Sequence, residues 1–153
     1  MRALICEIAR LNSVFFVQSV QCWLSQTREG VVPKAVMGSD QIYWVLTVTT
    51  DDLGKFKTLV QKLVAATEKE PGALNYEYAV GDDQKTVDIF ERYNNSRAAV
   101  DHVANFGQNF AEEFLSLVKP VRFVVYGVPT DELKKALADF HPVYMTPFDG
   151  FTK

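Results

Sequence analysis

Residues Thr86–Phe114, TVDIFERYNNSRAAVDHVANFGQNFAEEF, contain the two patterns that decide the fold of this chain. Up to Tyr93 the stretch alternates between apolar and polar side chains, which is typical of a half-buried β-strand. Asn94-Asn95-Ser96 then interrupts the alternation, and we expect the Ser96 hydroxyl to cap the helix that follows. Beyond this turn, apolar side chains recur at spacings of three and four residues: Ala99, Val103, Phe106 and Phe110. The stretch therefore predicts a strand, a turn and an amphipathic helix.

His102 lies at the edge of the apolar stripe on this helix. It comes three residues after Ala99 and four before Phe106, and the strand that precedes the helix ends in Tyr93. On that strand, alternate positions share one face: Val87, Ile89, Glu91 and Tyr93. A titratable ring at the border of a core is a candidate functional group, so we predict His102 and Tyr93 as catalytic residues. The alternative is a histidine at a helix boundary that is bonded to a carbonyl group or to water and has no chemical role.

Length and composition limit the possible classes of protein. A chain of 153 residues is expected to form one domain with a sizeable core. Its net charge of -3, and the lack of any run of Lys and Arg, argue against a nucleic-acid-binding surface. No stretch is long and apolar enough to span a bilayer. Cys6 and Cys22 lack the spacing of a zinc site or a disulfide framework, and we therefore expect a cytoplasmic protein.

Residues 1–40 differ in character from the rest of the chain. Apolar residues at helical spacing are followed by a segment from Thr27 to Asp40 that Gly, Pro and Ser interrupt, as in a linker. We predict that residues 1–40 are an N-terminal extension and linker, that residues 1–36 are not needed for folding, and that residues 41–153 form the domain. The alternative is a helix in this part that packs on the domain or on a partner chain.

Within the predicted domain, alternation, helical stripes and turn residues give the order of the elements. Strands are predicted at Ile42–Thr50, Leu74–Val80, Thr86–Tyr93 and Val121–Val128, with a short edge strand at Val143–Met145. Helices are predicted after Asp52 up to Pro71-Gly72, around His102 with a break at Gly107, and after the capping residue Thr130. Gly81-Asp82-Asp83 is a turn signal, so the second and third strands should form a hairpin.

These elements follow the order β-α-β-β-α-β, with an added short helix and tail, which is typical of the ferredoxin-like split βαβ arrangement. We therefore predict an α+β fold in which an antiparallel sheet carries both long helices on one face. The other face would hold too many apolar side chains to be left in water. A homodimer in which two such sheets pack together would bury them.

The sequence lacks the motifs of several cofactor and metal sites. It has no Gly-rich phosphate loop, no Cys/His metal set and no G-x-S-x-G elbow. We therefore expect an enzyme here to work without a metal, flavin or nicotinamide. What remains is an aromatic interior, and the residues predicted to bind a substrate are Asn75, Tyr76, Tyr78 and Phe106. Each has an alternative structural role, because aromatic side chains fill a core and Asn75 lies beside a turn.

Two runs of sequence, EPGALNYEYAV at Glu70–Val80 and DIFERYNNSRAAVDHVANFGQNF at Asp88–Phe110, resemble the antibiotic biosynthesis monooxygenase family, including its quinol monooxygenase-like members. In that family an E-x-G turn leads into a strand, and a strand that ends in E-x-W/Y leads into a helix with a histidine. The resemblance covers about Ile42–Gly127. It implies a dimeric α/β barrel of the ferredoxin-like type and, for some members, oxygenation of phenolic or quinol substrates without a prosthetic group. By position, Tyr93 stands where many members have Trp, and His102 matches the helix histidine.

The resemblance leads to a functional prediction, a cofactor-independent monooxygenase that oxidises a quinol or polyphenol with dioxygen. His102 would take the phenolic proton, because a neutral imidazole with an ordinary pKa of about 6.5 suits this task. Tyr93 would position the ring, and Asn75 or Tyr93 would donate to the developing oxyanion. Two alternatives stay open, an isomerase of a small polar metabolite and a non-catalytic dimer that binds a hydrophobic ligand or partner, like the stress-responsive dimeric barrels.

Overall fold

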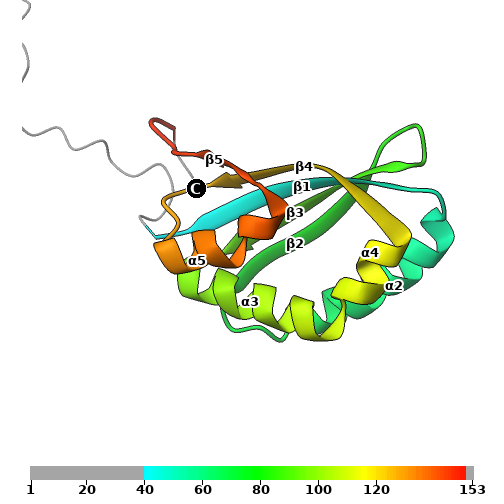
Figure 1. The fold of residues 1–153 in the computed structure, drawn as a ribbon, viewed down its shortest axis with the longest axis horizontal. Helices are drawn as coiled ribbons and strands as arrows, with labels where there is room; N and C mark the ends of the chain where they lie inside the picture. Colours follow the sequence, from blue (N-terminus) through cyan, green and yellow to red (C-terminus); the bar gives the residue numbers. More distant parts are fainter. Residues whose placement is uncertain (1–39, 151–153) are drawn as a thin grey trace, which may run out of the picture. The chain divides into compact units, whose positions relative to one another are not determined.

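The computed structural model describes residues 40–150, so the predicted extension at residues 1–40, with both cysteines, lies outside the described residues except for Asp40. The elements are β1 Ile42–Thr50, α2 Leu53–Thr67, β2 Ala73–Val80, β3 Thr86–Tyr93, α3 Ser96–Asn109, α4 Ala111–Leu117, β4 Val118–Tyr126, α5 Asp131–Ala136, the 3-10 turn η1 Ala138–Phe140 and β5 Val143–Met145 (Figure 1). The predicted α+β class and ferredoxin-like order are confirmed. Within residues 40–150, every helix is too short or too polar to cross a membrane.

The strands form one open sheet in the order β2-β3-β1-β4-β5. Strand β1 is central and pairs antiparallel with β3 and β4, while β5 pairs parallel with β4 at the edge. Trp44 on β1 lies opposite Glu91 on β3 and Val125 on β4. Because directly opposite residues point to the same side of a sheet, this register puts all three side chains on one face.

In the described part of the chain, the helices lie on one side of the sheet, the side that carries Trp44 and Glu91 (Figure 1). The core beneath them has two clusters. One contains Ile42, Trp44, Tyr93, Ala99, Phe123, Val125, Leu133 and Leu137. The other contains Val48, Phe56, Leu59, Leu63, Val87, Ile89, Phe114 and Val118. Leu46 packs against both clusters, so the two meet under the middle of the central strand.

Helix α2 shows how the sequence builds this layer. The Asp52 side chain accepts a hydrogen bond from the Lys55 backbone N–H at 2.9 Å and caps the helix. Phe56, Leu59 and Leu63 recur at spacings of three and four and are buried against the sheet. Burying an apolar side chain of this size contributes about 1.5–3 kcal/mol, so this stripe fixes the helix to the sheet.

Three local predictions were wrong. The cap of α3 is Asn95, whose side chain accepts from Ala98 N, while Ser96 is already helical and its hydroxyl accepts from Thr130 N. The helix continues past Gly107 and breaks at Phe110, so that α4 can turn toward the sheet. Strand β4 begins at Val118 rather than at Val121, and it includes Pro120 at a register shift where the missing N–H of proline is tolerated.

Candidate functional site

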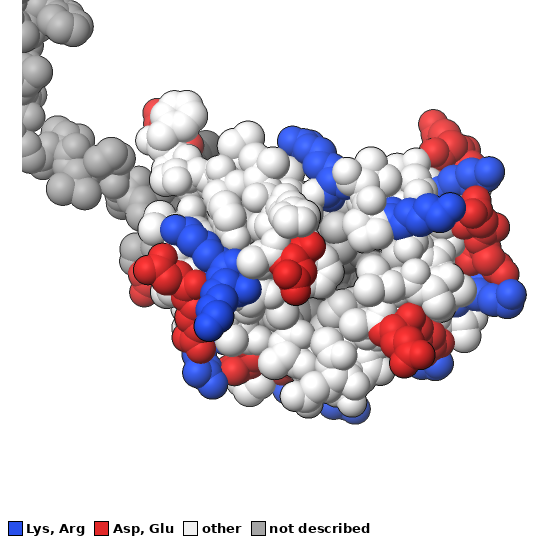
Figure 2. Space-filling view, viewed as in Figure 1, with Lys and Arg blue, Asp and Glu red and all other residues white. Residues whose placement is uncertain are grey.

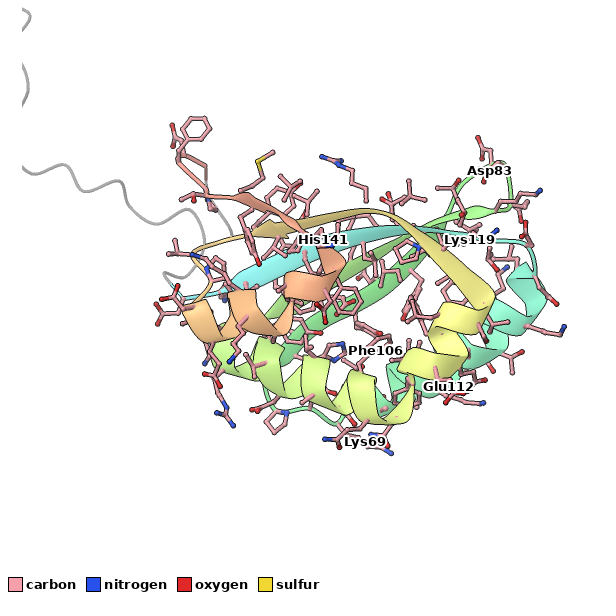
Figure 3. The ribbon with its side chains drawn as sticks, viewed as in Figure 1. Lys69, Asp83, Phe106, Glu112, Lys119 and His141 are labelled. Carbon is pink, nitrogen blue, oxygen red and sulfur yellow. The ribbon has the colours of Figure 1, made fainter. Side chains whose placement is uncertain are left out.

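A small chamber lies between the sheet and α3, where the two core clusters meet. Its volume is about 50 Å³, and Figure 3 shows Phe106 pointing from α3 into the space below the sheet. Most of its wall is apolar or aromatic: Trp44, Leu46, Tyr76, Ile89, Val103, Phe106, Phe114, Phe123, Leu137 and Phe140. Glu91 and His102 complete the wall. A ligand in the chamber would therefore meet an acid–base pair in mostly apolar, aromatic surroundings.

His102 lies between two glutamates. Its Nδ1 is 2.9 Å from Oε2 of Glu70, and its Nε2 is 3.3 Å from Oε2 of Glu91. The side chains of His102 and Glu91 are each 7% exposed and that of Glu70 is 18% exposed. Because both ring nitrogens face carboxylate oxygens, the imidazolium form, which has a proton on each nitrogen, satisfies both contacts.

Each glutamate is held by a second donor. The Tyr93 hydroxyl donates to Oε2 of Glu91 at 2.6 Å, and Nδ2 of Asn105 donates to Oε1 of Glu70 at 2.7 Å. Helix α3 contributes both His102 and Asn105, one helical turn apart, and β3 contributes both Glu91 and Tyr93, two residues apart on one face. We call these four side chains and Glu70 the array. The spacing of the four along α3 and β3 follows from the side-chain periods of a helix and of a strand.

Burial disfavours the charged form of each of these groups, and the neighbours decide the outcome. For His102, burial lowers the pKa, but the hydrogen bond to Glu70 and the charge of Glu91 outweigh it, so the pKa lies above 6.5. For Glu70, burial is overcome by hydrogen bonds from His102 and Asn105, and the pKa is lowered. Glu70 and His102 therefore form an ionised pair.

Glu91 behaves differently from Glu70. Burial raises its pKa above 4.5, and the charge of His102 and the hydrogen bond from Tyr93 only partly offset this. Burial and the nearby Glu91 also raise the pKa of Tyr93 well above 10, so Tyr93 stays a neutral donor. The carboxyl group at the chamber wall thus holds its proton closer to neutral pH than an ordinary glutamate does, which suits an acid–base role.

The turn after α2 brings Glu70 to the array. A side chain on Gly72 would place its Cβ 2.2 Å from the Cβ of Ala98 on α3, far inside contact distance. Glycine at this position allows α3 to approach the turn closely. That close approach is what allows His102, one turn further along α3, to reach Glu70.

Of the six residues predicted from the sequence, His102, Tyr76 and Phe106 line the chamber. Tyr93 is fully buried next to the chamber, and its ring centroid lies 5.2 Å from that of His102. Its hydroxyl contacts Glu91 rather than the open space. The structure therefore places Tyr93 where it can orient Glu91.

The remaining two predicted residues lie outside the chamber wall. Tyr78 donates its hydroxyl hydrogen bond to Tyr76 at 2.8 Å, so it supports a residue of the wall. Asn75 lies opposite Arg92 in the β2–β3 pairing, on the face of the sheet away from His102. An alternating strand places neighbours on opposite faces, which separates Asn75 from Tyr76.

Sequence reasoning missed Glu70, Glu91 and Trp44 as site residues. Both glutamates are the first residues of the E-x-G and E-x-W/Y motifs. Glu91 also stands on an otherwise apolar strand face, where an acidic side chain calls for a buried partner. Among residues 40–150, no group of three His, Cys, Asp or Glu side chains is arranged to hold a metal ion.

Comparison with solved structures shows where this fold occurs elsewhere. The chain is similar to MupZ from Pseudomonas fluorescens, with a TM-score of 0.69 and 22% identity over 76% of this chain and 91% of that one. It is also similar to SnoaB, a cofactor-independent oxygenase from Streptomyces nogalater, with a TM-score of 0.53 and 14% identity over 60% of this chain and 95% of that one. A candidate antibiotic biosynthesis monooxygenase from Nitrosomonas europaea gives a TM-score of 0.54 and 15% identity over 60% and 93% of the two chains.

The sequence matches no family model, and it matches no curated protein. At identities of 14% to 22%, the structural similarities establish a shared fold. The ferredoxin-like α+β fold that the sequence resemblance implied, of the type found in antibiotic biosynthesis monooxygenase structures, is confirmed.

Proposed function

We propose that this chain is a cofactor-independent monooxygenase that oxidises a quinol or polyphenol-type small aromatic with dioxygen. The observation that supports the proposal is the contact of 3.3 Å between Glu91 and His102 at the wall of an aromatic chamber. The SnoaB fold similarity is consistent with this chemistry, since that protein is a cofactor-independent oxygenase.

The reaction needs a base, a dry space and an electron-rich substrate. Loss of a phenolic proton converts the quinol to an anion that transfers an electron to dioxygen, and recombination of the two radicals forms a new C–O bond. Loss of water from the resulting hydroperoxide leaves a hydroxyquinone. Each quinol and each dioxygen thus give one hydroxyquinone and one water: one oxygen atom enters the product, and the other leaves as water with two hydrogens from the quinol.

In this proposal Glu91 replaces His102, the predicted proton acceptor, because both ring nitrogens of His102 face carboxylate oxygens and the imidazolium already carries a proton on each. Glu91 at the wall accepts the phenolic proton. Before the transfer, the adjacent imidazolium of His102 stabilises the Glu91 carboxylate, and after the transfer it stabilises the substrate anion. Tyr93 orients Glu91 through its hydroxyl, which replaces the predicted role of holding the substrate ring. The aromatic walls at Tyr76 and Phe106 pack on the ring and exclude water.

The competing functions differ in the ligands they need. Among isomerases of small polar metabolites, one with a phosphorylated substrate requires cations at the site, and the chamber wall has no Lys or Arg among the described residues. A non-catalytic binding protein would need the aromatic wall but not the charged array. Glu91 and His102 place an acid–base group at the chamber wall, where a ligand would lie, and this supports a chemical use for both residues.

Oxygen uptake by the purified full chain with a panel of substituted hydroquinones tests the proposal. We expect oxygen-dependent formation of the hydroxyquinone and one water per oxygen consumed. His102→Ala should reduce kcat by about 10²–10³-fold, the usual cost of removing one group that stabilises a developing anion. Circular dichroism of the variant establishes that it is folded. No uptake with any quinol, or full activity of a folded His102→Ala, would contradict the proposal.

We also propose that the chain is a homodimer that buries the sheet face away from the helices. In the described residues this face carries half-buried Tyr43, Val45, Phe90 and Tyr126, and the rings of Tyr43 and Tyr126 stack with centroids 4.7 Å apart. Apolar surface of this extent favours association. Light scattering should give the mass of a dimer, and Phe90→Asp should shift it toward the monomer. Val128→Asp, at a position 69% exposed and outside the strands, is the control.

A further inference from the structure

A second hollow lies outside the chamber, between β4, β5, η1 and α4, and we call it the outer groove. Its volume is about 760 Å³. Its apolar lining includes Leu46, Leu115, Val121, Phe123, Phe140 and Val143. In Figure 2 the surface is hollowed between the η1 and α4 sides of the molecule, and most of the surrounding atoms belong to uncharged residues.

The outer groove and the chamber share walls. Leu46, Phe123 and Phe140 line both spaces. The rings of Phe123 and Phe140 meet edge to face, with centroids 6.3 Å apart, at this boundary. Phe140 is 38% exposed and belongs to the short turn η1. The boundary is therefore made by side chains, one of them at the surface, rather than by backbone.

The sizes of the two spaces indicate how they would be used. Pockets that hold small molecules measure about 300–1,000 Å³, a range that includes the outer groove and excludes the chamber of about 50 Å³. The chamber is thus smaller than a pocket that encloses a whole small-molecule ligand. A substrate that reaches Glu91 must therefore have the rest of its atoms outside the chamber.

Part of the lining that the outer groove exposes to water is apolar. Val121 is 63% exposed, and Leu115 and Val143 are each 50% exposed. These three side chains come from β4, α4 and β5 and gather around one hollow. Isolated exposed apolar residues are ordinary, but a cluster beside a functional site is typical of a ligand surface.

We propose that the outer groove binds an apolar chain attached to the phenolic ring, so that the substrate is an amphiphile whose hydroxyl end reaches Glu91. This inference rests on the proposed function for the identity of the ring. The chain would lie on Leu115, Val121 and Val143 and pass Phe140 at the boundary. Arg122, Asp139 and His141 at the rim of the groove stay in contact with water.

Binding of 4-alkylphenols to the full chain, measured by calorimetry, tests the proposal. These compounds have the phenolic hydroxyl but lack the second hydroxyl of a quinol, so binding is measured without turnover. Complete burial of a methylene group contributes about fourfold in affinity. We expect the Kd to fall about two- to fourfold for each methylene added from ethyl to hexyl.

Val121→Asp should remove this dependence on chain length and leave the Kd of 4-ethylphenol nearly unchanged. Because the side chain of Val121 is 63% exposed, the substitution is compatible with the fold. Val128→Asp, 69% exposed and outside the groove, is the matched control and should keep the dependence.

A Kd that does not change with chain length, or a Val121→Asp variant that keeps the wild-type dependence, would overturn the proposal. A change of oligomeric state in Val121→Asp would also overturn it, because the groove would then be an interface between copies of the chain. If only the proposed function is wrong, the Kd would still depend on the length of the alkyl chain, but no quinol would support oxygen uptake.

Discussion

Oε2 of Glu91 on β3 lies 3.3 Å from Nε2 of His102 on α3, and both side chains form part of the wall of the same aromatic chamber. The opposite ring nitrogen of His102 contacts Glu70 at 2.9 Å. The imidazole is thus held between one carboxylate that faces the chamber and one that faces away from it. This asymmetry distinguishes the roles of the two glutamates and gives rise to separate predictions for each.

Glu91→Gln should abolish most activity, because the amide keeps the shape of the side chain but cannot accept the substrate proton. We expect kcat in the quinol oxidation assay to fall by about 10²–10⁴-fold, with a change in KM of much smaller size. Glu112→Gln on α4, an exposed acidic position labelled in Figure 3, is the matched control and should retain activity. Equal activity of the two variants would exclude Glu91 as the proton acceptor.

Tyr93→Phe should shift the pH dependence of activity. The Tyr93 hydroxyl donates to Glu91 at 2.6 Å and lowers its pKa, so its removal raises that pKa further. Since the carboxylate must be ionised to accept a proton, the acidic limb of the kcat/KM profile should move to higher pH. A profile of kcat/KM between about pH 4 and 8, a range that includes the ordinary pKa values of Glu and His, measures the shift. An unchanged acidic limb would mean that Glu91 does not titrate in the reaction.

Glu70→Gln should destabilise the protein in a pH-dependent way. The folded-state pKa of His102 is raised, so its contribution to stability is fully present below 6.5 and is lost as the pH rises through the folded-state value. The Glu70 contribution, from a lowered pKa, is present above 4.5 and is lost as the pH falls through its folded-state value. The difference from wild type in urea unfolding should therefore be largest, about 1–3 kcal/mol, between these limits. A difference that does not decrease at alkaline pH would contradict the ionised pair.

Two glycine substitutions should have opposite effects. A Cβ at Gly72 would lie 2.2 Å from the Cβ of Ala98, so Gly72→Ala should cost about 1–3 kcal/mol and separate α3 from the turn. A Cβ at Gly107, inside α3, meets nothing within 4 Å, so Gly107→Ala should stabilise by about 0.5–1 kcal/mol. Thermal unfolding of both variants checks the pair, and NMR of the His102 ring in folded Gly72→Ala would show whether the contact with Glu70 is lost. Similar melting temperatures for the two variants would refute the close packing of Gly72 on α3.

Local signals were enough for the bounds of β1 and β3, because alternation and β-branched residues are properties of a single strand. The order of elements followed from the same signals, and with it the ferredoxin-like fold. The wrong cap and the wrong helix break had tertiary causes. Ser96 uses its hydroxyl for Thr130, 34 residues away, and Phe110 ends α3 where α4 must turn to bury Phe114.

The sequence by itself determined that His102 lies at the edge of a packed helix and that Glu91 shares a strand face with Tyr93, since both are consequences of periodicity. It could not determine which face of the sheet the helices cover, because both faces carry apolar residues. Only the tertiary structure decided that Glu91 faces inward, that Asn75 faces the other side, and that Glu70 returns from the end of α2 to pair with His102. The contact between Glu70 and His102 joins residues 32 positions apart, and the packing of α3 on the turn at Gly72 brings them together.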